Sequence, residues 1–190
     1  MRITGDTLEP SLGSNITVPN EMGINVSSTE VLEIGSTGII AQVPYWNIVD
    51  QKTNGTNAGT FTSAGWRTRD LNTTIGSNTI TGSSLLSNQF VLPSGTYRIN
   101  ASSPAFGVNQ HKIKLRNITD STDVIIGSSE NCVGVQTRSF LNGVFTISSS
   151  KTFEIQHYGN TTSNTNGFGS ASSFSVVEIY TQVELWKLGN

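Results

Sequence analysis

The sequence has little cysteine, little charge and no long apolar run. It contains a single cysteine, Cys132, so an intrachain disulfide and a zinc site made of several cysteines are both excluded. Charged residues make up 13% of the chain and the net charge is -2, which provides no basic surface for nucleic acid. No stretch approaches the ~20 apolar residues of a membrane-spanning helix. The first ten residues, MRITGDTLEP, have no apolar core of a secretion signal. We therefore expect no nucleic-acid partner and no membrane insertion.

The sequence also has no sustained helical period of apolar residues. Short apolar groups alternate with polar residues and are separated by turns rich in Gly, Asn, Ser and Thr, which is the pattern of short strands. Two strands are expected around the turn Pro93-Ser94-Gly95, because Pro favours the second position of such a turn. Other expected strands lie in YWNIVDQ, HKIKLRNI, VIIGSSENC, RSFLNGVFTI, KTFEIQHY and VVEIYTQVELWKLGN. This number of strands predicts an all-β protein, an antiparallel jelly-roll β-sandwich of about ten strands.

Residues 1–43 differ from the rest of the chain. Their apolar clusters are only three to five residues long and are broken by Pro19-Asn20, Gly23, Gly35 and Gly38. Such pieces are too short to bury a core of their own. We expect an irregular, β-rich N-terminal arm over 1–43 and a jelly-roll domain over 44–190. The arm is either disordered, or adds strands to a neighbouring chain, or lies along the surface of another protein.

Two local patterns in the domain carry further expectations. Asn142-Gly143 is a strong hairpin signal, or else marks a bulge. In HKIKLRNI, the apolar residues alternate with Lys112, Lys114 and Arg116, so these three cations are expected on a solvated face.

The residues that carry catalytic chemistry are few. His111 and His157 both lie in alternating strand patterns, which indicates packed strand histidines rather than a catalytic base. Cys132 next to Val133 is typical of a small buried residue. No Gly-x-Ser-x-Gly nucleophile motif occurs, and the sequence places no two carboxylates at a catalytic separation. We predict no enzyme, no cofactor, no metal and no catalytic residue, although a loop Ca²⁺ ion involving Asp120 and Asp123 stays open.

The last expected strand has two different faces. One consists of Val177, Ile179, Val183 and Leu185, and the other mixes Tyr180, Gln182 and Trp186 with Glu178 and Glu184. The first face is that of a protein core. The second suits neither a dry core nor plain solvent, because a buried carboxylate needs a partner.

The order of the motifs from Trp46 to Leu188 resembles a jelly-roll module of bacteriophage and prophage virion proteins. These motifs are DQKTNGTNAGTFTSAGWRTRDLNT, NQFVLPSGTYRINASSPAF, HKIKLRNITDSTDVIIGSSE, TRSFLNGVFTI, KTFEIQHYGN, GFGSASSF and VEIYTQVELWKL. The module is similar to the globular head of complement and to the tumour-necrosis-factor family.

The resemblance implies a compact homotrimer that is joined through the sheet of the last strand. It places Val177, Ile179, Val183 and Leu185 in the protomer core, and Tyr180, Gln182 and Trp186 against a neighbouring subunit. The alternative for the two aromatic residues is that they lie on the free surface or pack beneath a loop.

The resemblance also implies a non-enzymatic protein of the virion. If the chain is complete, residues 1–43 leave little room for the shaft of a tail fibre, which favours a capsid decoration (cement) protein fastened to the major capsid protein by its arm. The alternative is a tail-fibre or receptor-binding knob on the tail that recognises a host surface glycan or protein, through loops such as 51–60 and 159–173. A glycan-active enzyme of the particle is the third hypothesis.

Overall fold

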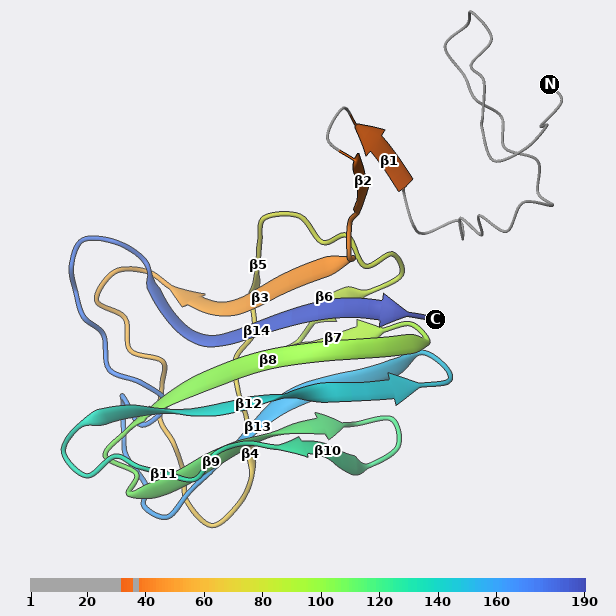
Figure 1. Ribbon diagram of the computed structural model, residues 1–190. Coiled ribbons are helices and arrows are strands. Elements are labelled where there is room, and N and C mark those ends of the chain that lie inside the picture. Colours follow the sequence, from red (N-terminus) through yellow and green to blue (C-terminus); the bar gives the residue numbers. More distant parts are fainter. Residues whose placement is uncertain (1–31, 36–37) are drawn as a thin grey trace, which may run out of the picture. The chain divides into compact units, whose positions relative to one another are not determined.

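The computed structural model describes residues 32–35 and 38–190 (Figure 1). The chain divides into two units, Met1–Gln42 and Val43–Asn190. In the first unit, β1 (Leu32–Gly35) and β2 (Gly38–Ala41) form an antiparallel two-stranded sheet. The other apolar clusters predicted for the arm lie outside the described residues.

The second unit is a sandwich of two antiparallel sheets, with no helix in its 148 residues, 43–190. One sheet has seven strands, in the order β10-β9-β13-β7-β6, with β11 beside β9 and β4 beside β13; the other has five, in the order β12-β8-β14-β3-β5. The strands are β3 (Tyr45–Lys52), β4 (Arg67–Thr68), β5 (Thr73–Ile75), β6 (Ser84–Leu86), β7 (Gln89–Leu92), β8 (Gly95–Phe106), β9 (Gln110–Asn117), β10 (Thr122–Ile126), β11 (Glu130–Asn131), β12 (Gln136–Ile147), β13 (Lys151–Gly159) and β14 (Glu178–Gly189). The predicted all-β, antiparallel jelly-roll sandwich is confirmed.

The core lies between the two sheets, because alternate residues of each strand point toward the facing sheet. Aromatic rings form its centre: Trp46 meets Phe90 edge-on at 6.5 Å between ring centroids, and Phe90 stacks on Phe153 at 5.8 Å. All three side chains are almost fully buried. Each large apolar side chain buried in this way contributes about 1.5–3 kcal/mol, so packing takes the place of disulfides in this domain.

The turns predicted at Pro93-Ser94-Gly95 and at Asn142-Gly143 have different outcomes. The turn Pro93-Ser94-Gly95 does join two strands, β7 and β8. Asn142-Gly143, in contrast, forms neither a hairpin nor a bulge, because β12 pairs with β8 in unbroken register from Gln136 to Ile147. A Cβ atom on Gly143 would lie 2.9 Å from Cδ1 of Ile125. Gly143 therefore provides room for Ile125 of β10 to pack against β12.

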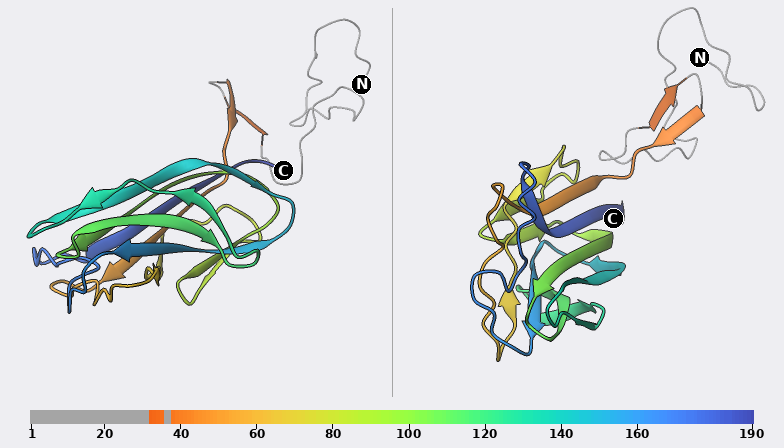
Figure 2. Two further views of the ribbon diagram at one scale, coloured as in Figure 1. Left: turned by 90° about the horizontal axis from the view of Figure 1, so that it is seen from below. Right: turned by 90° about the vertical axis from the view of Figure 1, so that its left-hand side faces the viewer.

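The two ends of the sandwich carry different parts of the chain. The backbone N–H of Lys187 donates to the carbonyl of Pro44 at 2.9 Å, so the chain enters the domain beside its C-terminus (Figure 2). At the other end, which we call the loop end, lie the connections 53–66, 107–109, 132–135 and 160–177. The predicted recognition loops 51–60 and 159–173 belong largely to this end. Within the described residues, no helix has the length and apolar character needed to cross a membrane.

Candidate self-association surface

The outward side of the five-stranded sheet, here called the β14 face, consists of cross-strand rows of side chains. The pairing of β12, β8, β14, β3 and β5 fixes which residues share a row. The three rows are Phe140, Ser102, Gln182 and Val49; Asn142, Asn100, Glu184, Asn47 and Ile75; and Val144, Arg98, Trp186 and Tyr45.

The first and third rows, together with the end of the second, expose large apolar side chains. Phe140 is 49% exposed, Val144 60% and Ile75 42%. Trp186 packs against Tyr45 at 5.3 Å between ring centroids, and the Arg98 guanidinium lies 5.6 Å from the Trp186 ring. Aromatic, aliphatic and arginine side chains that share one exposed face are typical of a protein–protein interface.

The middle row is polar, and its carboxylate is satisfied. Glu184 accepts a hydrogen bond from the Tyr45 hydroxyl at 2.9 Å and another from Asn100 Nδ2 at 3.2 Å. Burial, followed by the interaction with Glu184, raises the pKa of Tyr45 to about 12, so its hydroxyl stays a donor at neutral pH. These neutral donors allow Glu184 to lie on the face without an ionic partner.

One acceptor of the middle row is unsatisfied. Asn47 Oδ1 is buried and has no hydrogen-bond partner within the described residues. Asn47 lines a hollow of about 440 Å³ together with Phe140, Gln182 and Glu184. A buried acceptor without a partner costs about 1–3 kcal/mol, so a second molecule that brings a donor to Oδ1 by a shift of the Asn47 side chain would be stabilising.

The predicted core residues of the last strand lie in two environments. Val183 and Leu185 are fully buried in the core. Val177 precedes β14 and is 51% exposed, while Ile179 is half-buried and lines the hollow of the β14 face. The prediction of these two residues as core is wrong. The cause is a register shift in β14 between Ile179 and Gln182, which reverses the alternation of the strand.

The prediction for Tyr180 is wrong for the same reason. Its side chain is only 2% exposed, and its hydroxyl donates to the carbonyl of Thr56 at 2.8 Å. A Cβ atom on Gly169 would lie 2.5 Å from Tyr180 Cδ1, so the ring packs directly against the 160–177 loop. The alternative, packing beneath a loop, is correct for Tyr180. Gln182 and Trp186 do lie on the β14 face, and their role in a trimer stays a prediction.

The sequence reasoning missed the most exposed residues of this face, which come from β12. In RSFLNGVFTI, Leu141, Phe145 and Ile147 supply the core, while Phe140 and Val144 occupy the opposite side. The sequence did contain a signal, because this strand has apolar residues on both of its sides. In a strand with one solvated face, apolar residues alternate with polar ones.

Glu178, at the start of the last strand, also finds partners at the loop end. Glu178 accepts hydrogen bonds from the backbone N–H groups of Gly55, Ser172 and Ser173. These bonds lower the pKa of Glu178 and keep it charged. Glu178 therefore holds two loops of the loop end together.

The histidines are packed strand residues, as predicted. His111 Nδ1 lies 2.9 Å from His157 Nε2, and His111 Nε2 lies 2.8 Å from the hydroxyl of Thr137. Burial lowers the pKa of His111 to about 4 and that of His157 well below its ordinary value. Cys132 is fully buried, and burial raises the pKa of its thiol. These groups are neutral and shielded at neutral pH.

The carboxylates considered for a Ca²⁺ ion are both paired with cations. Asp120 lies 2.6 Å from Lys151 Nζ, and Asp123 lies 2.9 Å from Lys114 Nζ and 2.8 Å from Arg116. Lys114 is itself only 5% exposed. The expectation that all three cations of β9 are solvated is therefore wrong for Lys114, because Asp123 compensates its burial.

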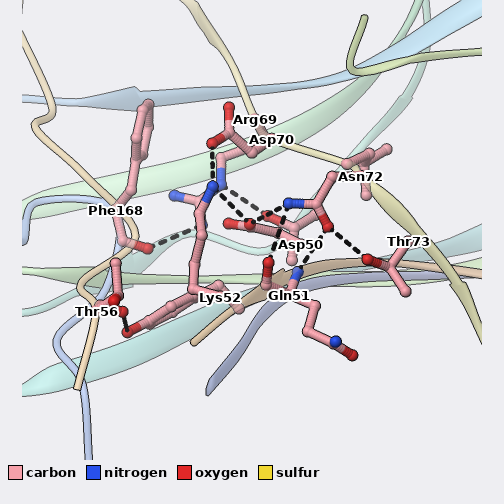
Figure 3. A network of polar contacts seen from close by, with 12 residues as sticks. Asp50, Gln51, Lys52, Thr56, Arg69, Asp70, Asn72, Thr73 and Phe168 are labelled. Atoms are coloured by element: carbon pink, nitrogen blue, oxygen red, sulfur yellow. Dashed lines mark hydrogen bonds and ion pairs between the residues drawn. The ribbon is translucent and has the colours of Figure 1, made fainter. Parts of the chain in front are cut away.

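A buried polar network joins the two sheets near the loop end (Figure 3). Arg69 is fully buried; its backbone N–H donates to Ile155 of the seven-stranded sheet, and its side chain donates to Thr181 of the five-stranded sheet. The guanidinium also donates to the carbonyl of Phe168 at 2.8 Å. Close by, Lys52 Nζ lies between the carboxylates of Asp50, at 3.1 Å, and Asp70, at 2.6 Å. Apart from Asp50 Oδ2, which is buried without a hydrogen-bond partner within the described residues, these groups are engaged within one chain, so the network has a structural role.

Comparison with known proteins bears on the fold alone. No family model matches the chain, and no curated protein matches it. Among solved structures, it is similar to the globular domain of zebrafish complement 1qA protein, with a TM-score of 0.50 and 11% identity over 77% of this chain and 98% of that one. It is also similar to murine APRIL, with a TM-score of 0.46 and 10% identity over 77% of this chain and 100% of that one. The likeness to the complement domain supports the jelly-roll fold.

Proposed function

We propose that this protein is a non-enzymatic structural protein of a bacteriophage particle, a homotrimer that decorates the capsid. The observation that carries the trimer is the β14 face, which exposes Phe140 and Val144 and has a hollow lined by Phe140 and by Asn47, whose buried acceptor Oδ1 is unsatisfied. Burial of such a face between protomers removes apolar surface from water and brings donors to the hollow.

The arm supports attachment to a second protein. The β1-β2 hairpin of residues 32–35 and 38–41 has only two strands, and within the described residues neither outer edge pairs with another strand. An isolated two-stranded hairpin is marginally stable, and a free edge adds readily to the sheet of another chain. Three arms on one trimer would bind a capsid with high avidity even where each contact is weak.

The trimer is tested by the mass of the protein in solution, measured by light scattering after size-exclusion chromatography. We expect three protomers for the full chain and one for the double variant Phe140→Asp, Val144→Asp, since six carboxylates would then meet at the interface. The matched control is Leu86→Asp, Ile126→Asp, two exposed apolar residues of the seven-stranded sheet. It should keep the trimer. A monomeric full chain would contradict the proposal.

The place of the protein in the particle is tested by cryo-electron microscopy of the phage that encodes it, with and without residues 1–43. The full chain should give density on the head, and the truncated chain should remain a soluble trimer that no longer binds capsids. Density on the tail would contradict capsid decoration. Undiminished capsid binding by the truncated chain would contradict attachment through the arm.

One observation favours the alternative of a receptor-binding knob. The loop end exposes apolar side chains at Val133 (64%), Val135 (54%), Phe174 (80%) and Val176 (65%). This end lies opposite the point where the chain enters the domain, which is the position of a recognition tip. Binding of the isolated protein to host cells, lost on Phe174→Ser with Val176→Ser, would support this alternative.

A further inference from the structure

A groove crosses the outward side of the seven-stranded sheet, away from the β14 face. Its volume is about 710 Å³, which is within the range of small-molecule sites. Three neighbouring strands line it, since β9 pairs with β13 on one side and with β11 on the other, and Trp66 comes from the loop just before β4. Its lining combines the aromatic rings of Trp66 and Tyr158 with polar side chains, among them Gln110, Lys112, Asn131 and Asn160.

Two aromatic rings form one wall of the groove. Trp66 and Tyr158 lie 5.6 Å apart between ring centroids in an edge-on arrangement. Lys114 Nζ lies 4.1 Å from the centre of the Trp66 ring, and its ion pair with Asp123 holds the ammonium there. The Trp66 side chain is therefore fixed by Tyr158 and Lys114, and both aromatic residues are only half-buried.

The rest of the lining is polar and mixed in charge. Register places Lys112 directly opposite Tyr158, and Asn131 directly opposite Gln110. Asn160 Nδ2 donates to Gln110 Oε1 at 2.9 Å, which orients both amides. Within the described residues, the Lys112 ammonium, the Asn131 amide and the Tyr158 hydroxyl make no side-chain hydrogen bond. These groups are available to a ligand.

We propose that this groove binds a sugar residue of a polysaccharide. A pyranose ring has apolar C–H faces that pack on aromatic rings and vicinal hydroxyls that both donate and accept hydrogen bonds. Trp66 and Tyr158 match the first property. The amides of Gln110, Asn131 and Asn160, the Glu130 carboxylate and the Lys112 ammonium supply donors and acceptors for the second. A nucleic-acid strand fits less well, because a single unpaired cation provides no track for phosphates.

The groove does not depend on the proposed trimer. Its lining comes from β9, β11 and β13 and the adjoining loops, whereas the β14 face is formed by the other sheet. A trimer joined through the β14 face would present three such grooves outward, so that weak single sites act together on a polymer.

The test is saturation-transfer difference NMR of the full chain with glucose, galactose, rhamnose and N-acetylglucosamine as separate probes, followed by titration with oligosaccharides of the sugar that binds. We expect binding of at least one probe in the millimolar range. Trp66→Ala and Asn131→Ala should each weaken it at least about tenfold. Phe174→Ala, an exposed aromatic residue at the loop end, is the matched control and should leave it unchanged.

Folding of the variants is checked through the midpoint of their unfolding in urea. Asn131 is exposed, so Asn131→Ala should fold and still test the site if Trp66→Ala unfolds. Absence of binding by all four probes and by oligosaccharides of the host surface would overturn the proposal. Binding that Phe174→Ala abolishes and Asn131→Ala leaves intact would move the site to the loop end and overturn it equally. Neither outcome affects the mass of the trimer, so the two proposals fail separately.

Discussion

The outward faces of the two sheets differ in how their side chains are satisfied. On the seven-stranded sheet, Lys114 and Arg116 share Asp123, and Glu154 accepts hydrogen bonds from Thr68, Gln89 and Gln156. On the β14 face, no ion pair occurs among the described residues, and Phe140 and Val144 are exposed. Around Asp123 and Glu154, the polar groups of the seven-stranded sheet are already paired with one another, whereas on our proposal the β14 face is the one that contacts a second protomer.

This difference follows from the alternation of individual strands. β9 places Lys112, Lys114 and Arg116 outward, whereas β12 places Phe140 and Val144 outward. Both strands bury aliphatic residues on their inner side. The inner faces therefore explain why the sheets pack, and the outer faces differ in whether charged or apolar side chains are exposed.

The largest effect is expected where the two sheets are joined, at Arg69. We predict that Arg69→Met destabilises the domain by about 3–5 kcal/mol, because it removes a buried cation and leaves Asp50 less compensated. Burial already lowers the pKa of Arg69 to about 9, with Asp50 and Asp70 opposing the shift. The free energy of unfolding in urea is the measurement.

Arg67→Met is the matched control for this prediction. Within the described residues, the Arg67 guanidinium donates only to the backbone carbonyls of Thr62 and Ser63, in the loop that precedes β4. Its loss should cost about 1 kcal/mol or less. If both substitutions lowered the free energy of unfolding equally, the contacts of Arg69 with the two sheets would add no stability of their own.

The seven-stranded sheet should also make the domain sensitive to acid. Burial lowers the pKa of His111 from 6.5 to about 4, so between these values the unfolded chain binds more protons than the folded one. Stability is then complete above pH 6.5 and falls as the pH drops toward 4, by about 3 kcal/mol for His111. Unfolding in urea at several pH values, for the full chain and for His111→Gln with His157→Gln, measures this loss. An unchanged slope in the double variant would refute the assignment.

The sequence predicted the sandwich well because alternation and turns are local properties. Tyr45–Lys52 and Gln110–Asn117 are strands where the pattern placed them, and His111 and His157 pack as expected. The candidate surface was predicted only through Gln182 and Trp186. Tyr180 was misplaced because the bulge of β14 depends on pairing with Lys52–Tyr45 of β3, which lies more than a hundred residues earlier.

Other errors have the same origin in contacts distant along the chain. Gly143 belongs to a strand because Ile125 needs its space, although Asn-Gly by itself favours a turn. Lys114 is buried because Trp66 and Asp123 both approach it. No local pattern contains this information.

The smallest effect is expected from replacing Asn47, whose Oδ1 is unsatisfied. It is the most direct test of whether the β14 face differs from the outer face of the seven-stranded sheet. In the double variant Phe140→Asp, Val144→Asp, the β14 face has no partner. Asn47→Ala then removes an acceptor that makes no hydrogen bond, at the cost of some packing. In the full chain, the same substitution also removes the acceptor that a neighbouring protomer would satisfy. We expect Asn47→Ala to destabilise the full chain by about 1 kcal/mol more than the double variant.

This difference is measured as a double-mutant cycle of unfolding free energies at one fixed protomer concentration, because the stability of a trimer depends on concentration. The loss of packing at Asn47 is common to both backgrounds and cancels in the cycle. What remains is the interaction between Asn47 and the partner across the β14 face. A coupling of zero would mean that no donor of a neighbouring protomer reaches Asn47 Oδ1, and the hollow of the β14 face would then not be part of a protomer interface.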